Sequence, residues 1–145
     1  MVSESAFPEA DAHQMIWLWA DKFGLRDWDV RFTPKPADDG LLAQVDFRTA
    51  EKVAQIRVAE DVPDEEVLEA CIVHEMLHLA LKPYTIPTER LLATLSEPLR
   101  TIMAGQLEDA EEEIIETLVR AFGFDRYRPT GELVELWPAF VPGSL

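Results

Sequence analysis

The order of apolar patterns along the chain predicts an α+β fold. A helical pattern comes first, three short stretches of alternating apolar and polar residues follow, and helical patterns continue to about residue 122. The chain has 145 residues, 48% of them hydrophobic, which is enough to form one domain around its own core. We therefore expect a single domain over residues 1–122, with a tail at 123–145 packed on the same domain.

The first predicted helix covers residues 8–24. Pro8 suits the first turn of a helix, acidic residues follow it, and Gly24 suits a C-terminal stop. His13 is expected to be an exposed residue of this helix. Apolar residues recur at helical spacing along one face, namely Ile16, Trp19, Ala20 and Phe23. All four tryptophans are expected in the core, at positions 17, 19, 28 and 137.

Three strands are predicted next, over residues 28–34, 41–49 and 52–59. In each stretch apolar residues alternate with polar ones, which is the pattern of a strand with one buried face. The polar link at 48–52, "RTAEK", resembles a hairpin connection between the second and third strands. We expect a small three-stranded, mostly antiparallel sheet.

A buried helix is predicted after the strands, with Asp64 as its N-cap. Between Ala70 and Leu81 it is apolar nearly all round, which is typical of a central helix covered on every side. Pro83 is expected to end this helix and to begin a loop over residues 83–87.

A further helical region is expected over residues 88–122, with Pro98 and Gly105 as the places where it could break. The tail, at 123–145, is rich in proline and glycine and carries Trp137 and Phe140, so an irregular strap over the domain is expected.

Charge and cysteine content restrict the classes of partner. A formal net charge of −15 disfavours direct binding to nucleic acid and suits either a solvated acidic surface or basic partners. No apolar run is long enough to cross a membrane, and the first residues, "MVSESAFPEADAH", do not resemble a secretion signal. Cys71 is the single cysteine, so no internal disulfide can form, and a cytoplasmic location is predicted.

The motif with the clearest chemistry is His74-Glu75-Met76-Leu77-His78, which is H-E-x-x-H on the buried helix. Residues four apart lie one turn apart on one helical face, so His74 and His78 can converge on one zinc ion. Glu75 flanks that point and can take a proton from a zinc-bound water, then pass it to a leaving amine. The alternative is a pair of ordinary core histidines with no metal.

The stretch "VHEMLHLAL", preceded by a small sheet and followed by a helix with a glutamate cluster, resembles the zincin metallopeptidases. It is most similar to small gluzincin-type domains, including phage-encoded ones, and the resemblance covers about residues 28–122. It implies a zincin-like fold, two histidine ligands to zinc, a third ligand from a glutamate on the next long helix, and Glu75 as the base. It also implies that an edge strand, from 41–49 or 52–59, pairs with an extended peptide substrate.

The third ligand is expected within residues 107–122. Glu111 falls near the middle of the apolar stripe there, where a carboxylate is costly to bury unless it is paired or binds a metal, and Glu112 lies at its edge. We expect Glu111 first and Glu112 second, and the alternative is one solvated charged face. The predicted stripe consists of Leu107, Ala110, Ile114, Ile115, Leu118 and Phe122.

Two further residues near the motif have a functional and a structural interpretation. Tyr84 could donate a hydrogen bond to a developing oxyanion, or it could cap the core from a loop. Cys71 lies three residues before His74 and could approach the metal, although a buried core thiol is the better interpretation.

The sequence therefore favours an enzyme, a zinc-dependent peptidase that acts on a peptide or protein substrate, with Glu75 and Tyr84 as catalytic candidates. The alternatives are a non-catalytic zinc-stabilised interaction module and an interaction protein with no metal. Two histidines and a carboxylate suit zinc best, but iron, manganese, cobalt or nickel could use the same ligands. The oligomeric state does not follow from the sequence.

Overall fold

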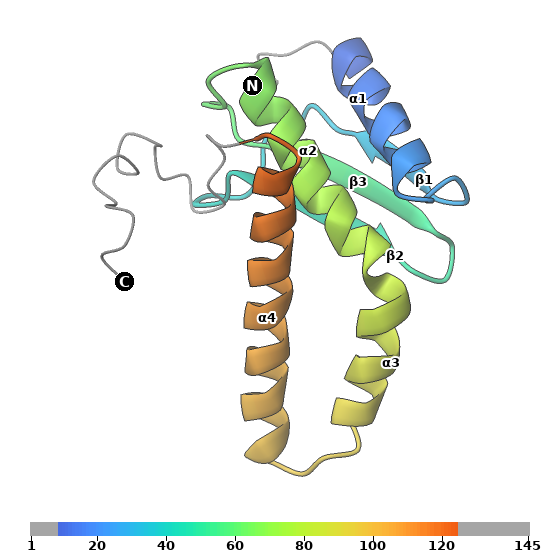
Figure 1. Cartoon of the computed structure of the whole chain (residues 1–145), viewed down its shortest axis with the longest axis vertical. Coiled ribbons are helices and arrows are strands. Elements are labelled where there is room, and N and C mark those ends of the chain that lie inside the picture. Colours follow the sequence, from blue (N-terminus) through green and yellow to red (C-terminus); the bar gives the residue numbers. More distant parts are fainter. Residues whose placement is uncertain (1–8, 125–145) are drawn as a thin grey trace.

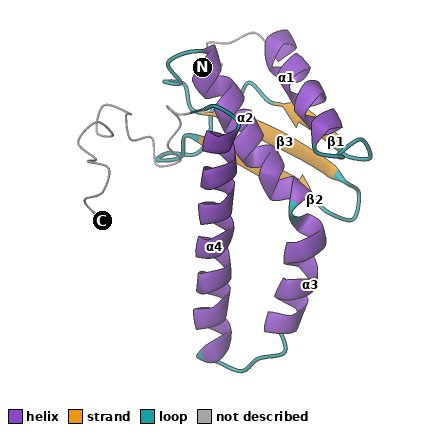
Figure 2. Ribbon diagram, in the orientation of Figure 1, coloured by secondary structure: helices purple, strands orange, loops and turns teal. Residues whose placement is uncertain are grey.

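The computed structural model describes residues 9–124 and has the α+β architecture expected from the sequence (Figures 1 and 2). One helix comes first, three strands follow, and three helices complete the described chain. No described helix has the length and apolar character needed to cross a membrane. The elements are α1 (Glu9–Lys22), β1 (Asp29–Phe32), β2 (Ala43–Arg48), β3 (Val53–Val58), α2 (Glu65–Ala80), α3 (Lys82–Leu92) and α4 (Leu99–Ala121).

The three strands form a mixed sheet in the order β1-β3-β2. The expected hairpin is confirmed, because β2 and β3 pair antiparallel with Val45 opposite Ile56. β1 pairs with β3 in parallel, with Val30 opposite Ala54, so the sheet is mixed and the antiparallel arrangement expected from the sequence is confirmed only for β2 and β3. Alternation within a strand shows which face is buried, but it does not show which neighbour the strand takes or in which direction. The segment between β1 and β2 carries the chain to the far edge, and β3 returns between them.

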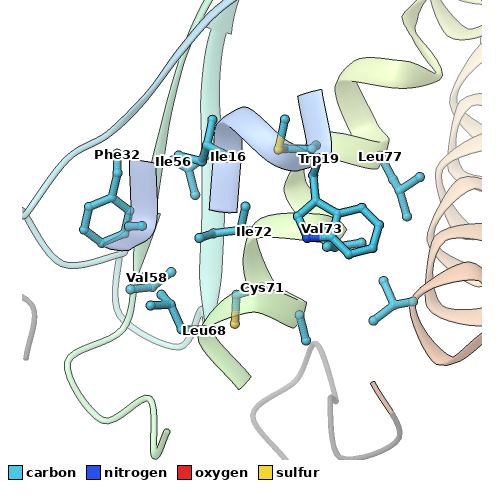
Figure 3. Packing of buried hydrophobic residues seen from close by; sticks show 14 of the residues in the cluster. Ile16, Trp19, Phe32, Ile56, Val58, Leu68, Cys71, Ile72, Val73 and Leu77 are labelled. Carbon is cyan, nitrogen blue, oxygen red and sulfur yellow. The ribbon is translucent and has the colours of Figure 1, made fainter. Parts of the chain in front are cut away.

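Helices α1 and α2 pack on the same face of the sheet (Figure 1). Figure 3 shows Ile16 and Trp19 of α1 beside Ile72 of α2, with Ile56 of the sheet in the same cluster. The apolar stripe expected for the first helix is confirmed, since Ile16 and Trp19 are buried and the other two members pack against the core. Trp17 is 80% exposed, so its assignment to the core is wrong. α1 has an open outer side, and Trp17 lies there.

Helix α2 is the central element of the core. The Asp64 carboxylate accepts a hydrogen bond from the Val67 backbone N–H at 3.0 Å, which confirms the predicted N-cap. Eleven of its 16 residues are buried. The sheet lies on one side of α2, while α1 and the C-terminal part of α4 contact others, so the helix is covered nearly all round as its sequence predicts.

The segment after α2 is helical, and the loop expected over residues 83–87 is wrong. Leu81 alone separates α2 from α3, and Pro83 lies in the first turn of α3. Proline fits there because the N–H it lacks would have no partner within the helix. Of the two expected breaks in the next helical region, the one near Pro98 is present, whereas Gly105 lies inside an unbroken α4.

Beyond the core, α3 and the first half of α4 project past the sheet and are joined at their far ends by a loop (Figures 1 and 2). We call residues 82–110 the helical arm, and α1, the sheet and α2 the body. Thr85 is the one buried residue of the arm. α4 contacts the body through its C-terminal part, where Ile115 and Val119 are fully buried. Large apolar side chains are exposed along the arm, namely Tyr84, Leu91, Leu99, Ile102 and Met103.

The predicted packing of residues 123–145 as a strap concerns mainly residues outside the described part of the chain. Phe124, the last described residue, is buried, and its ring centroid lies 6.0 Å from that of Trp19. Trp137 and Phe140 lie outside the described residues.

Candidate metal centre

Two imidazole rings stand one turn apart on α2. The ring centroids of His74 and His78 are 5.1 Å apart and the ring planes meet at 63°. The His74 side chain is 4% exposed and that of His78 is 16% exposed. Because α2 is packed from several sides, both rings are held in place by their surroundings, as the apolar context of the motif predicts.

Helix α4 places a carboxylate between the two rings. One oxygen of Glu112 lies 3.2 Å from His74 Nε2, and the other lies 2.8 Å from His78 Nε2. Ligand atoms about 2.1 Å from a tetrahedral zinc ion are separated by about 3.4 Å, so these spacings fit a shared ion. Ligand atoms of His74, His78 and Glu112 all lie within 4.8 Å of one another, and these residues could hold a metal ion.

Glu111 contacts the His78 ring on the edge opposite to Glu112. Its carboxylate oxygen lies 2.5 Å from His78 Nδ1, while Glu112 faces Nε2. A carboxylate on the far nitrogen of a ligating histidine fixes the orientation of the ring and strengthens the ring as a ligand. The geometry therefore favours Glu112 as the third ligand and Glu111 as the residue that orients His78.

The apolar stripe ranked these two glutamates in the other order because it indicates burial, and Glu111 is the more buried of the two, with 18% of its side chain exposed against 40% for Glu112. The buried residues of α4 are Ile115 and Val119, whereas the stripe members Ile114 and Ala110 are exposed. Glu111 and Glu112 lie four and three residues before Ile115, so both fall on the side of α4 that meets α2.

The charges of the site favour a proton on His78 when no metal is present. Burial lowers the pKa of His78, but the hydrogen bonds that protonated His78 donates to Glu112 and Glu111, together with the charge of Glu75, outweigh burial and raise the pKa to about 9. Hydrogen bonds to His74 and His78 hold the pKa of Glu112 well below its usual range. A metal ion bound here would take the place of this proton.

Glu75 has a different environment from the other two glutamates. It is 6% exposed, and burial raises its pKa, with a partial opposing effect from the charges of His74 and His78. A carboxylate whose pKa is raised towards neutral is a better base, and more of it is protonated near neutral pH, so it can serve both as base and as acid. Glu75 lines the same pocket as both histidines, which is the position that proton transfer in this site requires.

The pocket has a volume of about 400 Å³ and lies between β2, α2, the start of α3 and α4. Phe47 and Lys82 line it, although neither was predicted from the sequence as a site residue. The alternation of β2 could have indicated Phe47, whereas nothing in the sequence marks Lys82. The lining residues are Leu41, Ala43, Gln44, Val45, Phe47, His74, Glu75, His78, Lys82, Glu111 and Glu112.

Comparisons with protein-family models, with curated proteins and with solved structures found no match.

The two weaker candidates lie away from this pocket. Tyr84 is 63% exposed on α3 and does not line the pocket. Cys71 is fully buried, and burial, with the charge of Glu75, raises the pKa of its thiol far above the usual value. A protonated, enclosed thiol is a core side chain rather than a metal ligand. The remaining histidine, His13, is exposed on α1 as expected, where its Nε2 accepts a hydrogen bond from the Phe32 N–H at 3.2 Å.

Proposed function

We propose that the protein is a zinc-dependent peptidase whose metal is held by His74, His78 and Glu112. The observation that carries this proposal is the position of Glu112, whose two carboxylate oxygens face the Nε2 atoms of both histidines while buried Glu75 lines the same pocket. A pair of ordinary core histidines would not need a carboxylate from another helix or an acid beside them.

When bound, zinc would act as a Lewis acid that polarises a peptide carbonyl and makes a water molecule more acidic. Glu75 takes a proton from the attacking water onto its carboxylate and then delivers it to the departing amine, so it is regenerated in each cycle. Glu111 holds the His78 ring through Nδ1. The apolar packing around α2 keeps bulk water from solvating Glu75, which maintains its basicity.

An extended peptide would lie along β2. Within residues 9–124 the order β1-β3-β2 places β2 at an edge of the sheet and β3 at its centre, so of the two strands considered from the sequence β2 is the one available for pairing. Ala43, Val45 and Phe47 of β2 line the metal pocket. Backbone hydrogen bonds to a free edge hold a peptide extended and place alternate side chains towards the neighbouring pocket.

Replacement of the base tests the proposed reaction. Zinc-loaded wild-type protein should hydrolyse members of a broad peptide library, and Glu75→Gln should lower kcat/KM by at least about 100-fold, because the amide cannot accept the proton. The zinc content of Glu75→Gln should equal that of the wild type. Glu113→Gln, an exposed change on α4, is the matched control. A wild-type protein that holds one zinc per chain and cleaves no peptide contradicts the proposal.

A second candidate is a zinc-stabilised interaction module with no catalysis. The exposed apolar side chains of the helical arm, which include Leu91, Leu99 and Ile102, are the observation that favours it. In that case zinc would raise the unfolding temperature, Glu75→Gln would change neither zinc content nor partner binding, and no peptide would be cleaved. The library assay and the zinc content together therefore separate the two candidates.

A further inference from the structure

The side of the metal pocket between β2 and α3 is formed by an aromatic ring and a lysine. Lys82 Nζ lies 3.9 Å from the centroid of the Phe47 ring, a distance at which the ring attracts the cation. Phe47 is 42% exposed, and Lys82 is partly exposed at the first residue of α3. The ring therefore holds the ammonium group at the pocket while leaving part of it accessible.

Among the described residues that line this pocket, Lys82 is the one lysine or arginine, beside three glutamates. Among residues 9–124, no carboxylate forms an ion pair with Lys82. The chain has 28 acidic residues and 13 lysines and arginines, so carboxylates that could pair with a lysine outnumber the basic residues. An ammonium group has three N–H donors, and contact with a ring on one side leaves donors for an anionic ligand.

We propose that Lys82, positioned by Phe47, binds a carboxylate of the substrate, so that the site prefers peptides with an acidic group close to the scissile bond. This inference rests on the proposed peptidase function and adds the substrate class to it. The carboxylate can come from a glutamate or aspartate side chain or from a free peptide C-terminus, since both present the same group. A peptide paired with β2 would run directly past Phe47, and hence past Lys82.

Matched peptides test the charge preference. Peptides that the zinc-loaded protein cleaves are remade with glutamate, glutamine or lysine at each position near the scissile bond, and with a free or amidated C-terminus. At one position kcat/KM should be highest with glutamate, lower with glutamine and lowest with lysine. Alternatively, kcat/KM should be higher for the free than for the amidated C-terminus. The ratio of kcat/KM between acidic and neutral peptides should be about three- to fivefold, as for a partly exposed ion pair, and should fall with added salt.

The variant Lys82→Met keeps most of the length of the side chain, being one atom shorter, and removes its charge. It should bring the ratio of kcat/KM between acidic and neutral peptides close to one, and Lys82→Arg should restore part of it. Lys22→Met is the matched control, because Lys22 also lies over a ring, 5.1 Å from the centroid of Trp19, but outside the pocket. It should leave the ratio unchanged. An acidic preference that persists in Lys82→Met overturns the proposal.

Binding to the Glu75→Gln protein separates this inference from the proposed catalysis. Zinc-loaded Glu75→Gln and the double variant Glu75→Gln/Lys82→Met are titrated calorimetrically with pairs of library peptides that differ only in one glutamate or glutamine, whether or not the wild type cleaves them. The acidic peptide should bind about three- to fivefold more tightly to the single variant and equally to the double variant. If the wild type cleaves peptides but the acidic and neutral peptides bind equally well to Glu75→Gln, the proposed peptidase function is supported and the role of Lys82 is refuted. A Lys82-dependent difference in binding with no cleavage by the wild type supports carboxylate recognition and refutes the peptidase.

Discussion

The body and the helical arm of this protein are built on opposite principles. In the body, α2 buries eleven of its 16 residues between the sheet and neighbouring helices. In the arm, residues 82–110, Thr85 alone is buried and large apolar side chains such as Leu91 and Ile102 face outward. The candidate metal centre lies where these two regions meet.

The difference explains why the ligands come from these two helices. His74 and His78 need a rigid, apolar setting, which α2 supplies, whereas Glu112 needs a helix that approaches α2 without becoming part of the core. α4 does this because only its C-terminal part packs, through Ile115 and Val119, while its first half extends along the arm. A metal ion bound by His74, His78 and Glu112 would join the body to α4 just beyond the arm.

Neighbouring isoleucines on α4 give the largest expected contrast. Ile115 is fully buried and Ile114 is 50% exposed. Ile115→Ala should lower the free energy of unfolding by about 2–4 kcal/mol, because it removes buried methyl groups and leaves a cavity between α4 and the body. Ile114→Ala should cost less than about 1 kcal/mol. Urea titrations of both variants measure this difference, and similar losses would mean that α4 does not pack as described.

Two glutamates on α4, Glu111 and Glu113, test whether Glu111 supports the metal site by orienting His78. Glu111→Gln should weaken zinc binding by about 10- to 100-fold, because the amide holds the His78 ring less well through Nδ1. Glu113→Gln, at an exposed position, should leave zinc affinity unchanged. Competition with a chelator of known zinc affinity gives the two values. Equal affinities for the two variants would remove Glu111 from the site.

The junction of α2 and α4 should also respond to pH when metal is absent. The pKa of His78 is about 9 in the folded protein, above its ordinary value of 6.5. The interaction of protonated His78 with Glu111 and Glu112 therefore makes its whole contribution to the free energy of unfolding below about pH 6.5. This contribution, on the order of 2 kcal/mol, is lost as pH rises through about 9. Unfolding temperatures in a chelator between pH 6 and 9.5 should fall for the wild type and much less for His78→Gln. Parallel curves would contradict this assignment.

The smallest expected effect lies in the arm. Ile102 is 54% exposed on the first half of α4, so Ile102→Ser should change the free energy of unfolding by less than about 0.5 kcal/mol. Chemical denaturation of this variant beside the wild type measures the change. A loss comparable to that of Ile115→Ala would show that the outer face of the arm is covered, which would break the distinction between body and arm.

Sequence reasoning succeeded where one local pattern decides the structure. The N-cap at Asp64, the all-round burial of α2 and the hairpin between β2 and β3 each follow from residues close together in the chain. It failed where distant segments decide. The parallel pairing of β1 with β3 depends on the path of the chain around the sheet, which alternation does not encode.

The candidate site divides in the same way. His74, Glu75 and His78 could be identified because one helical turn fixes their mutual positions. Glu112 could not be ranked above Glu111, because both lie on the side of α4 that meets α2 and a helical pattern does not show which histidine nitrogen each carboxylate faces. Lys82 was missed because its place beside Phe47 depends on the start of α3, where Pro83 suggested a loop.

Zinc stoichiometry is the most direct test of the metal centre. Protein freed of metal with a chelator, dialysed against a small excess of zinc and then against metal-free buffer should hold one zinc ion per chain. Glu112→Gln should bind zinc at least about 100-fold more weakly, because the neutral amide is a poor ligand. His13→Gln, which changes the histidine outside the cluster, should bind zinc as the wild type does. A wild-type protein that takes up no zinc, or a Glu112→Gln protein with unchanged affinity, would contradict a site formed by His74, His78 and Glu112.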